Sequence, residues 1–309
     1  MDLCLYTDSV SDLSFEAALD LAAAIGCGSI EIAGGGQSSA PHLRLGELLG
    51  DRQKRIAFAD AFATRGLRIA ALNCSAWPLH PVHGPAQEAI IRDTIRLAGD
   101  LGVETIVSMS GTPGDGPGST TVNWVWYPWP DDAVALLDRQ WDIAIPFWQE
   151  MAAYATANGV KHIAFELHPL HLVFNVPTLL RMREVVGPII GANMDPSHLF
   201  WQQMDPLAAI AALGPAVKHV HLKDTGLQAD KVALAGVLDT TSFDGAASER
   251  AWVFRTVGRV HDKAWWASFI AALRSVGYDG PLSIENEDPY QGKVEGVEEA
   301  AAFIRPLIG

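Results

Sequence analysis

Four short polar clusters in the second half of this chain each follow directly on an apolar run. They are FELHP with Glu166 and His168, NMDPSH with Asp195 and His198, HVHLKD with His219, His221 and Lys223, and SIENEDP with Glu285 and Glu287. A single such carboxylate is usually a helix cap or a buried group with its hydrogen bonds satisfied. Four successive clusters favour chemistry instead, because carboxylates held close together repel one another unless a cation neutralises them.

A divalent metal ion is the cation that this pattern favours over a metal-free network of ion pairs. Three carboxylates and one imidazole form a site rich in oxygen, which suits Mn²⁺ best and is compatible with Mg²⁺, Co²⁺ or Zn²⁺. His219 and His221 are two residues apart, so both point to the same side of a strand. We expect His221, which is nearer the end of the strand, to be the ligand and His219 to pack one layer deeper.

The elements that must position these residues alternate between short apolar runs and stretches of helical period. We expect strands at Leu3–Tyr6, Ser29–Ile32, Leu67–Leu72, Thr105–Met109, His162–Phe165, Ile190–Met194, Lys218–Leu222 and Leu282–Ile284. We expect helices at Phe15–Ile25, Asp51–Arg65, Gln87–Leu101, Asp138–Asn158, Val176–Val186, Pro206–Ala212, Asp262–Val276 and near Val297–Leu307. This order predicts an α/β protein that forms one (β/α)₈ barrel over residues 1–309, with a doubly wound sheet as the alternative.

Two connections are long, and both leave the carboxyl ends of strands, where barrel enzymes build their active sites. The first insertion, Gly111–Leu137, follows strand four and contains Trp124, Trp126, Tyr127 and Trp129. The second insertion, Thr225–Val260, follows strand seven. We expect the aromatic rings of the first insertion to cover the substrate, rather than to be idle surface.

The composition limits the class of protein. A net charge of −14 excludes a nucleic-acid partner, which would require clustered Lys and Arg. The chain has no run of apolar residues long enough to span a bilayer and begins with no secretory signal, so we expect a cytoplasmic protein with no membrane partner. The three cysteines lie in separate apolar stretches, which predicts reduced core residues.

FELHP, DPSH, HVHLKD and SIENEDP in this order resemble the motifs of the xylose isomerase-like barrels. That superfamily includes sugar and sugar-phosphate isomerases and epimerases, inosose-processing enzymes and an endonuclease branch. The resemblance covers nearly the whole chain. It implies that Glu166, Asp195, His221 and Glu285 are the metal ligands, and that His198 contacts a substrate oxygen.

The chain departs from the ketose 3-epimerases of this superfamily at two positions. Leu172 stands where those enzymes carry a further Glu, and Leu227 stands where they carry an Arg. Their substrate clamp is therefore missing, which puts a free ketohexose substrate in doubt. The endonuclease branch needs further His ligands and a basic groove, and the chain offers neither.

The stretch from Trp252 to Pro289 also resembles a narrower group, the catalytic subunits of C-glycoside deglycosidases. These enzymes act on 3-keto-glycosides and pair with a small second subunit. The resemblance implies a hetero-oligomer of that kind, with a homo-oligomer as the alternative. The first insertion suits it, because flat rings accommodate an aromatic aglycone.

The reactions of these enzymes begin when a base removes the proton next to a carbonyl while the metal stabilises the oxygen that gains charge. We expect His168 to be the base, with Glu285 as the alternative, and His198 to hold a substrate hydroxyl or protonate a leaving group. We expect His198, Lys223, Trp124, Trp126 and Arg255 to contact the substrate. The expected outcome is β-elimination from a 3-keto-glycoside; isomerisation or epimerisation is the alternative, and a non-catalytic sugar-binding subunit is a remoter one.

Overall fold

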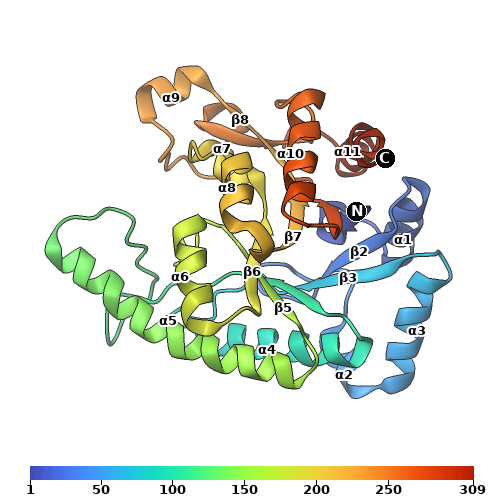
Figure 1. Cartoon of the computed structure of the whole chain (residues 1–309), viewed down its shortest axis with the longest axis horizontal. Coiled ribbons are helices and arrows are strands. Elements are labelled where there is room, and N and C mark those ends of the chain that lie inside the picture. Colours follow the sequence, from blue (N-terminus) through green and yellow to red (C-terminus); the bar gives the residue numbers. More distant parts are fainter.

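Eight parallel strands close into a barrel in the computed structural model, which describes residues 1–309 (Figure 1). The strands are β1 (Asp2–Tyr6), β2 (Ser29–Ala33), β3 (Arg68–Asn73), β4 (Thr105–Ser108), β5 (His162–Glu166), β6 (Ile190–Met194), β7 (Val217–Leu222) and β10 (Pro281–Ile284). Their order around the barrel follows the chain, and β10 pairs with β1 to close it. The predicted (β/α)₈ barrel is confirmed.

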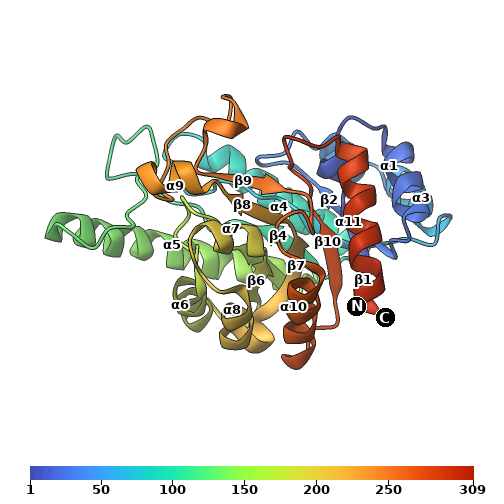
Figure 2. The ribbon, with the colours of Figure 1, turned by 90° about the horizontal axis from the view of Figure 1, so that it is seen from above.

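Helices surround this barrel on its outer side (Figures 1 and 2). They are α1 (Phe15–Ala24), α2 (Leu45–Gly50), α3 (Arg52–Ala63), α4 (Gly84–Leu101), α5 (Asp131–Ala157), α6 (Val176–Val186), α7 (Pro196–Trp201), α8 (Pro206–Leu213), α9 (Ala229–Ala235), α10 (Lys263–Ser275) and α11 (Lys293–Ile308). None is long and apolar enough to cross a membrane.

Local sequence sets where several of these helices begin. The side chains of Ser14, Asp51 and Asp262 accept hydrogen bonds from backbone N–H groups in the first turns of α1, α3 and α10. Asn175 and Thr178 form a reciprocal capping box at the start of α6. Each cap satisfies N–H groups that have no partner inside the helix, so the helix starts at that residue.

The core lies between the barrel and its helices, and it is continuous over most of the chain. Trp141 and Trp148 of α5 and Trp266 of α10 are among its largest fully buried side chains. Cys4 and Cys74 are also buried and, like Cys27, form no disulfide, as predicted. Burial of this apolar surface is the main favourable contribution to folding.

The two insertions differ from the sequence-based expectation. Helix α5 begins at Asp131 instead of Asp138, so the irregular part of the first insertion ends at Pro130. The extra turns of α5 project beyond the barrel (Figure 2). The second insertion is not simply a loop. In it, β8 (Asp224–Leu227) pairs antiparallel with β9 (Trp252–Arg255), and α9 belongs to the segment of chain that connects the two strands.

The loop after β2 approaches the loop after β3 so closely that one position requires glycine. Gly36 has a φ of +89°, and the next residue, Gln37, donates its backbone N–H to the Ser75 carbonyl at 2.7 Å. A Cβ at Gly36 would lie 2.3 Å from the Ser75 carbonyl oxygen. Gly36 therefore allows the close approach that places Gln37.

We predict that Gly36→Ala lowers the free energy of unfolding by more than about 1 kcal/mol, from backbone strain and the clash with Ser75. Gly46→Ala is the control, because nothing lies within 4 Å of a Cβ there. The control should be neutral or stabilising by up to about 1 kcal/mol, since Ala is the better helix former. Chemical denaturation measures both, and equal stability of the two variants would contradict the close approach.

Candidate metal centre and active site

Ligand atoms of Glu166, Asp195, His221 and Glu285 all lie within 4.8 Å of one another. Glu166 and His221 are in β5 and β7, while Asp195 and Glu285 directly follow β6 and β10. Parallel strands bring these positions together because all their carboxyl ends meet at one mouth of the barrel. The structure thus assembles the four expected ligand residues, and their role as ligands stays a prediction.

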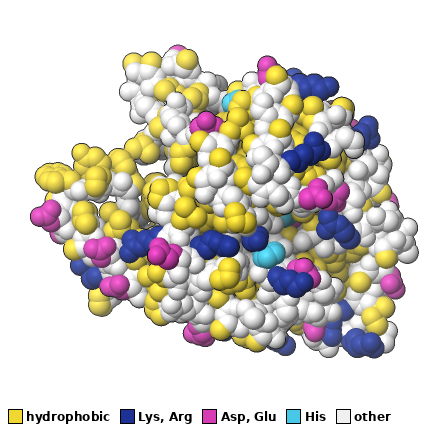
Figure 3. Space-filling view, viewed as in Figure 1, with side chains coloured by type: hydrophobic (Ala, Val, Ile, Leu, Met, Phe, Trp, Pro, Cys, Tyr) yellow, Lys and Arg dark blue, Asp and Glu magenta, His cyan; other side chains and the backbone are white.

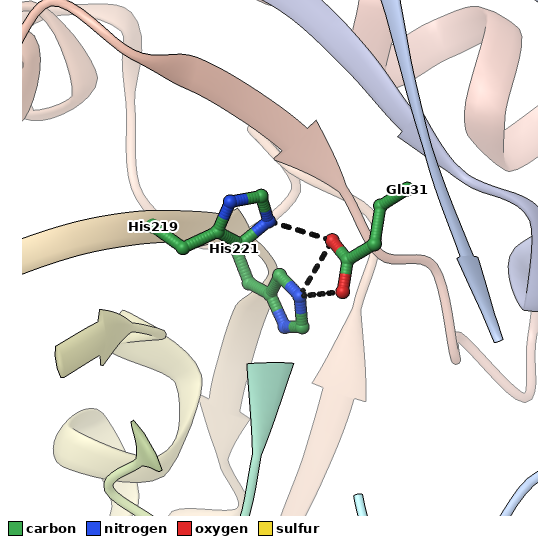
Figure 4. A group of neighbouring side chains, drawn as sticks. All are labelled: Glu31, His219 and His221. Carbon is green, nitrogen blue, oxygen red and sulfur yellow. Dashed lines mark hydrogen bonds and ion pairs between the residues drawn. The ribbon is translucent and has the colours of Figure 1, made fainter. Parts of the chain in front are cut away.

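The imidazole of His221 is oriented by a carboxylate that the sequence analysis did not single out. His221 Nε2 lies 3.0 Å from both carboxylate oxygens of Glu31, on β2 (Figure 4). When the ring is neutral, as a metal ligand must be, the proton on Nε2 is donated to Glu31 and the lone pair is on Nδ1. Nδ1 lies 3.0 Å from Glu285 Oε2 and 3.3 Å from Glu166 Oε2, but it makes no hydrogen bond.

Glu31 is completely buried and receives hydrogen bonds from several sides of the barrel interior. Its partners besides His221 are His219 Nε2 at 2.7 Å, Ser283 Oγ at 2.7 Å and Asn73 Nδ2 at 2.8 Å. Burial opposes the charge on Glu31, but the nearby imidazoles of His221 and His219 outweigh it and hold the pKa of the carboxyl well below its usual value. His219, two residues before His221 on β7, lies one layer deeper in the barrel than the expected ligands.

Asp195 uses its two oxygens differently. Oδ1 accepts the Ser197 backbone N–H at 2.8 Å and caps α7. Oδ2 is buried and has no hydrogen bond. Together with the unbonded Nδ1 of His221, it leaves two buried ligand atoms without hydrogen bonds among three carboxylates. Buried polar atoms normally have a partner, so this set fits a divalent cation.

Lys223 is the cationic side chain nearest these carboxylates. Its Nζ lies 2.6 Å from Glu285 Oε2, 3.0 Å from Glu287 Oε2 and 3.2 Å from Asp195 Oδ2. Burial would lower the pKa of the ammonium, but Asp195 and Glu285 hold the pKa well above its usual value. Lys223 therefore stays charged and balances part of the negative charge of the site.

A cavity of about 340 Å³ opens above this group. Glu166, Glu285 and Lys223 line it, together with both histidines expected to act on the substrate, His168 and His198. Other parts of the wall are Tyr6, Asp8, Gln37, Asn286 and the rings of Phe243 and Phe254. A concave space with convergent polar groups is the usual form of a small-molecule site.

His168 and His198 pack against each other, with ring centroids 4.2 Å apart. His168 Nδ1 donates to the Pro169 carbonyl at 2.6 Å, so Nε2 carries the lone pair. Burial, and then the neighbouring His198, lowers the pKa of His168 to about 3, which keeps the ring neutral at neutral pH. His198 Nε2 lies 3.1 Å from Glu166 Oε1, and neither ring nitrogen of His198 makes a hydrogen bond within the chain.

Three residues expected at the substrate are not part of the cavity wall. Trp124 donates its indole N–H to the His171 carbonyl, and Trp126 packs on Tyr127 with half of its surface exposed. Arg255 pairs with Asp288 at 3.0 Å. Two phenyl rings in the wall, Phe243 and Phe254, come from the second insertion instead, and the β8–β9 pair places Phe254 over Lys223.

Three residues of the site were not predicted from the sequence: Glu31, Phe243 and Phe254. Glu31 stands in SIEIA, where a charged residue inside a fully buried strand is itself a signal of function. Phe243 is mostly exposed and Phe254 lies in an ordinary apolar run, so no local pattern marks either.

Comparison with known proteins places the chain in a family. Residues 19–307 match the family model of the xylose isomerase-like TIM barrel. The chain belongs to this family. It is also 40% identical to the uncharacterized protein YfiH of Bacillus subtilis (strain 168), over all of this chain and 99% of YfiH.

Solved structures of low sequence identity share the barrel. The probable 3-DHS dehydratase AsbF of Bacillus anthracis has a TM-score of 0.70 at 15% identity, with 99% of each chain covered. The IolI protein with a bound zinc atom has a TM-score of 0.67 at 17% identity, over 100% of this chain and 98% of IolI. D-psicose 3-epimerase in the presence of D-fructose has a TM-score of 0.66 at 15% identity, with all of both chains covered.

We predict that Glu31→Gln weakens Mn²⁺ binding by about 10- to 100-fold, the usual effect of losing the carboxylate behind a ligating histidine. An amide cannot accept all the hydrogen bonds that converge on Glu31, so the His221 ring loses its fixed orientation. Isothermal titration of the metal-free protein with Mn²⁺ measures the affinity. Glu47→Gln, which removes an exposed carboxylate on α2, is the control. Equal affinity of both variants would show that Glu31 does not support a metal ligand.

Proposed function

We propose that this protein is a divalent-metal-dependent isomerase or epimerase that acts on a keto-sugar or an inosose. The observation that carries the proposal is the meeting of Glu166, Asp195, His221 and Glu285 at the base of a polar cavity that also contains His168 and His198. The structural relatives support the class of reaction, because a sugar epimerase and a zinc-binding protein share the barrel.

Glu166, Asp195, Glu285 and His221 Nδ1 are the groups that would hold the ion. Bound there, a divalent ion would stabilise negative charge on the carbonyl oxygen of the substrate, and Mn²⁺ suits this oxygen-rich set best. Glu31 keeps His221 in the tautomer that leaves Nδ1 free.

His168 is the proposed base that takes the proton next to the carbonyl. His168 lines the cavity, and its Nε2 carries a free lone pair because Nδ1 donates to the Pro169 carbonyl. Glu285, the alternative, already has Oε2 in contact with Lys223 and with His221. His198 would hold a substrate hydroxyl, since its nitrogens have no hydrogen bonds and Nε2 lies between Glu166 and Asp195.

We predict exchange of one carbon-bound hydrogen when the Mn²⁺-loaded protein meets its substrate in D₂O, measured by mass spectrometry over a panel of ketoses and inososes. His168→Ala should retain the metal and slow exchange by about 100-fold or more, the usual loss for a missing base. Asp195→Asn is the comparison that should lose metal and exchange together. A near-normal rate in His168→Ala would assign the base to Glu285.

Elimination from a 3-keto-glycoside is a second candidate, favoured by the two phenyl rings that the second insertion adds to the cavity wall. Phe243 and Phe254, with centroids 6.4 Å apart, could pack on an aromatic aglycone, and His198 could protonate the leaving group. The exposed rings of Trp126 and Trp129 would then be free for a contact with a second subunit, where aromatic side chains are enriched.

If elimination is the reaction, Phe243→Ala should raise KM for aryl 3-keto-glycosides by about fivefold, the worth of one aromatic contact. Trp126→Ala is the matched control from the first insertion and should leave KM unchanged. Initial rates of aglycone release measure both. A rise in KM for Trp126→Ala alone would show that the first insertion, and not Phe243, contacts the aglycone.

A further inference from the structure

The hydrogen-bond donors in the loop after the seventh strand of the barrel are already bound by carboxylates of the chain itself. In barrel enzymes the loops after strands seven and eight commonly hold a substrate phosphate through backbone N–H groups. Here these loops follow β7 and β10, the seventh and eighth strands of the barrel. The chain offers two groups of hydrogen-bond donors there that could bind an anion.

The first group of donors follows β9 and meets Asp224, which comes directly after Lys223. Asp224 Oδ2 accepts the backbone N–H groups of Gly258, Val260 and His261 at 3.3, 3.2 and 3.0 Å. Asp224 Oδ1 lies 2.6 Å from His261 Nδ1. The buried carboxylate of Asp224 thus takes up these donors, so they cannot bind another anion.

The second group of donors, at the end of β9, meets Asp288 after β10. Asp288 Oδ2 accepts from Arg255 Nε at 3.0 Å and from the Thr256 backbone N–H at 2.9 Å. The Thr256 hydroxyl also donates to it, at 3.1 Å. Arg255, which sequence analysis assigned to the substrate, is therefore committed to a neighbouring carboxylate.

The cavity itself offers no free cation. Lys223 is its only Lys or Arg, and the ammonium already contacts Asp195, Glu285 and Glu287. The carboxylates of Asp8, Glu166, Glu285 and Glu287 line the same space. With Asp195 included, their charge exceeds that of Lys223 and a divalent ion combined. This holds even without Asp8, whose pKa is raised by burial.

Several groups in the cavity suit uncharged hydroxyls. Asp8 lines the cavity and offers carboxyl oxygens to the hydroxyls of a ligand. The Gln37 amide is held only by a contact with the Met109 sulfur at 3.3 Å. Phe243 and Phe254 offer faces for the carbon skeleton. The volume of about 340 Å³ is at the small end for ligand sites, in the range of a monosaccharide.

From these observations we infer that the site is selective for an uncharged polyhydroxylated ketone and rejects sugar phosphates and keto acids. The excess of carboxylates in the cavity wall opposes an anion directly. Asp224 and Asp288 add to this selectivity, because they bind hydrogen-bond donors of the loop after β7 that an anion would otherwise need. The inference rests on the proposed function only in using the same cavity.

The test compares matched ligands on the Mg²⁺-loaded protein by saturation-transfer NMR. The pairs are D-fructose with D-fructose 6-phosphate, and D-ribulose with D-ribulose 5-phosphate. The free ketose of at least one pair should bind, and its phosphate should bind about 100-fold more weakly or not at all, because like charges brought together in a site strongly oppose binding. Tighter binding of the phosphates, or no binding of either free ketose, would overturn the inference.

Inorganic phosphate provides the second measurement. Asp288→Asn keeps the shape of the side chain but frees the charge of Arg255, so ³¹P line broadening should reveal phosphate binding in this variant and none in the wild type. Phosphate binding by the wild type, or none by a folded Asp288→Asn variant, would contradict the assignment.

The two proposals fail separately. Hydrogen exchange on phosphorylated ketoses alone would contradict the proposed selectivity but agree with the isomerase proposal. Binding of free ketoses without hydrogen exchange on any substrate would contradict the isomerase proposal but agree with the selectivity.

Discussion

Repulsion among buried carboxylates is the constraint on which this site depends. The barrel brings the ends of β5, β6, β7 and β10 to one mouth, so Glu166, Asp195 and Glu285 have no room to separate. Such a group is stable only when positive charge lies between its members. Lys223 provides one such charge, because its ammonium contacts Asp195 and Glu285 and also Glu287. Asp195 Oδ2 and His221 Nδ1 have no hydrogen bonds, so they suit a divalent ion that would supply the remaining positive charge.

The same balance of charges extends below and above the ligands. In the layer below, Glu31 on β2 fixes the rings of His219 and His221, so the orientation of the expected ligand on β7 depends on a strand that β1 and β10 separate from it. In the loops that follow β7 and β10, Asp224 accepts backbone N–H groups and Asp288 pairs with Arg255. These groups could otherwise bind an anion. An excess of negative charge therefore links the two proposed properties of the cavity, a high affinity for a cation and the rejection of anionic substrates.

The sequence predicted the parts of this arrangement that are local. The alternation of apolar runs and helical stretches was enough to predict the barrel. Polar clusters at the strand ends, such as FELHP and SIENEDP, were enough to predict that the four candidate ligands meet. Contacts between distant segments could not be read in this way, since Glu31 meets His219 across 188 positions of the chain. The second insertion shows the same limit. Only the pairing of β8 with β9 brings Phe254 to the cavity, while Trp126, chosen for its aromatic surroundings, lies on the exposed surface.

Anomalous diffraction at the manganese absorption edge, from crystals of the Mn²⁺-loaded protein, tests the central claim most directly. The account predicts one strong anomalous peak per chain, in contact with Glu166, Asp195, Glu285 and the Nδ1 atom of His221, with Nε2 still hydrogen-bonded to Glu31. A peak between Glu31, His219 and His221 instead, or no peak among the four residues at saturating Mn²⁺, would contradict it.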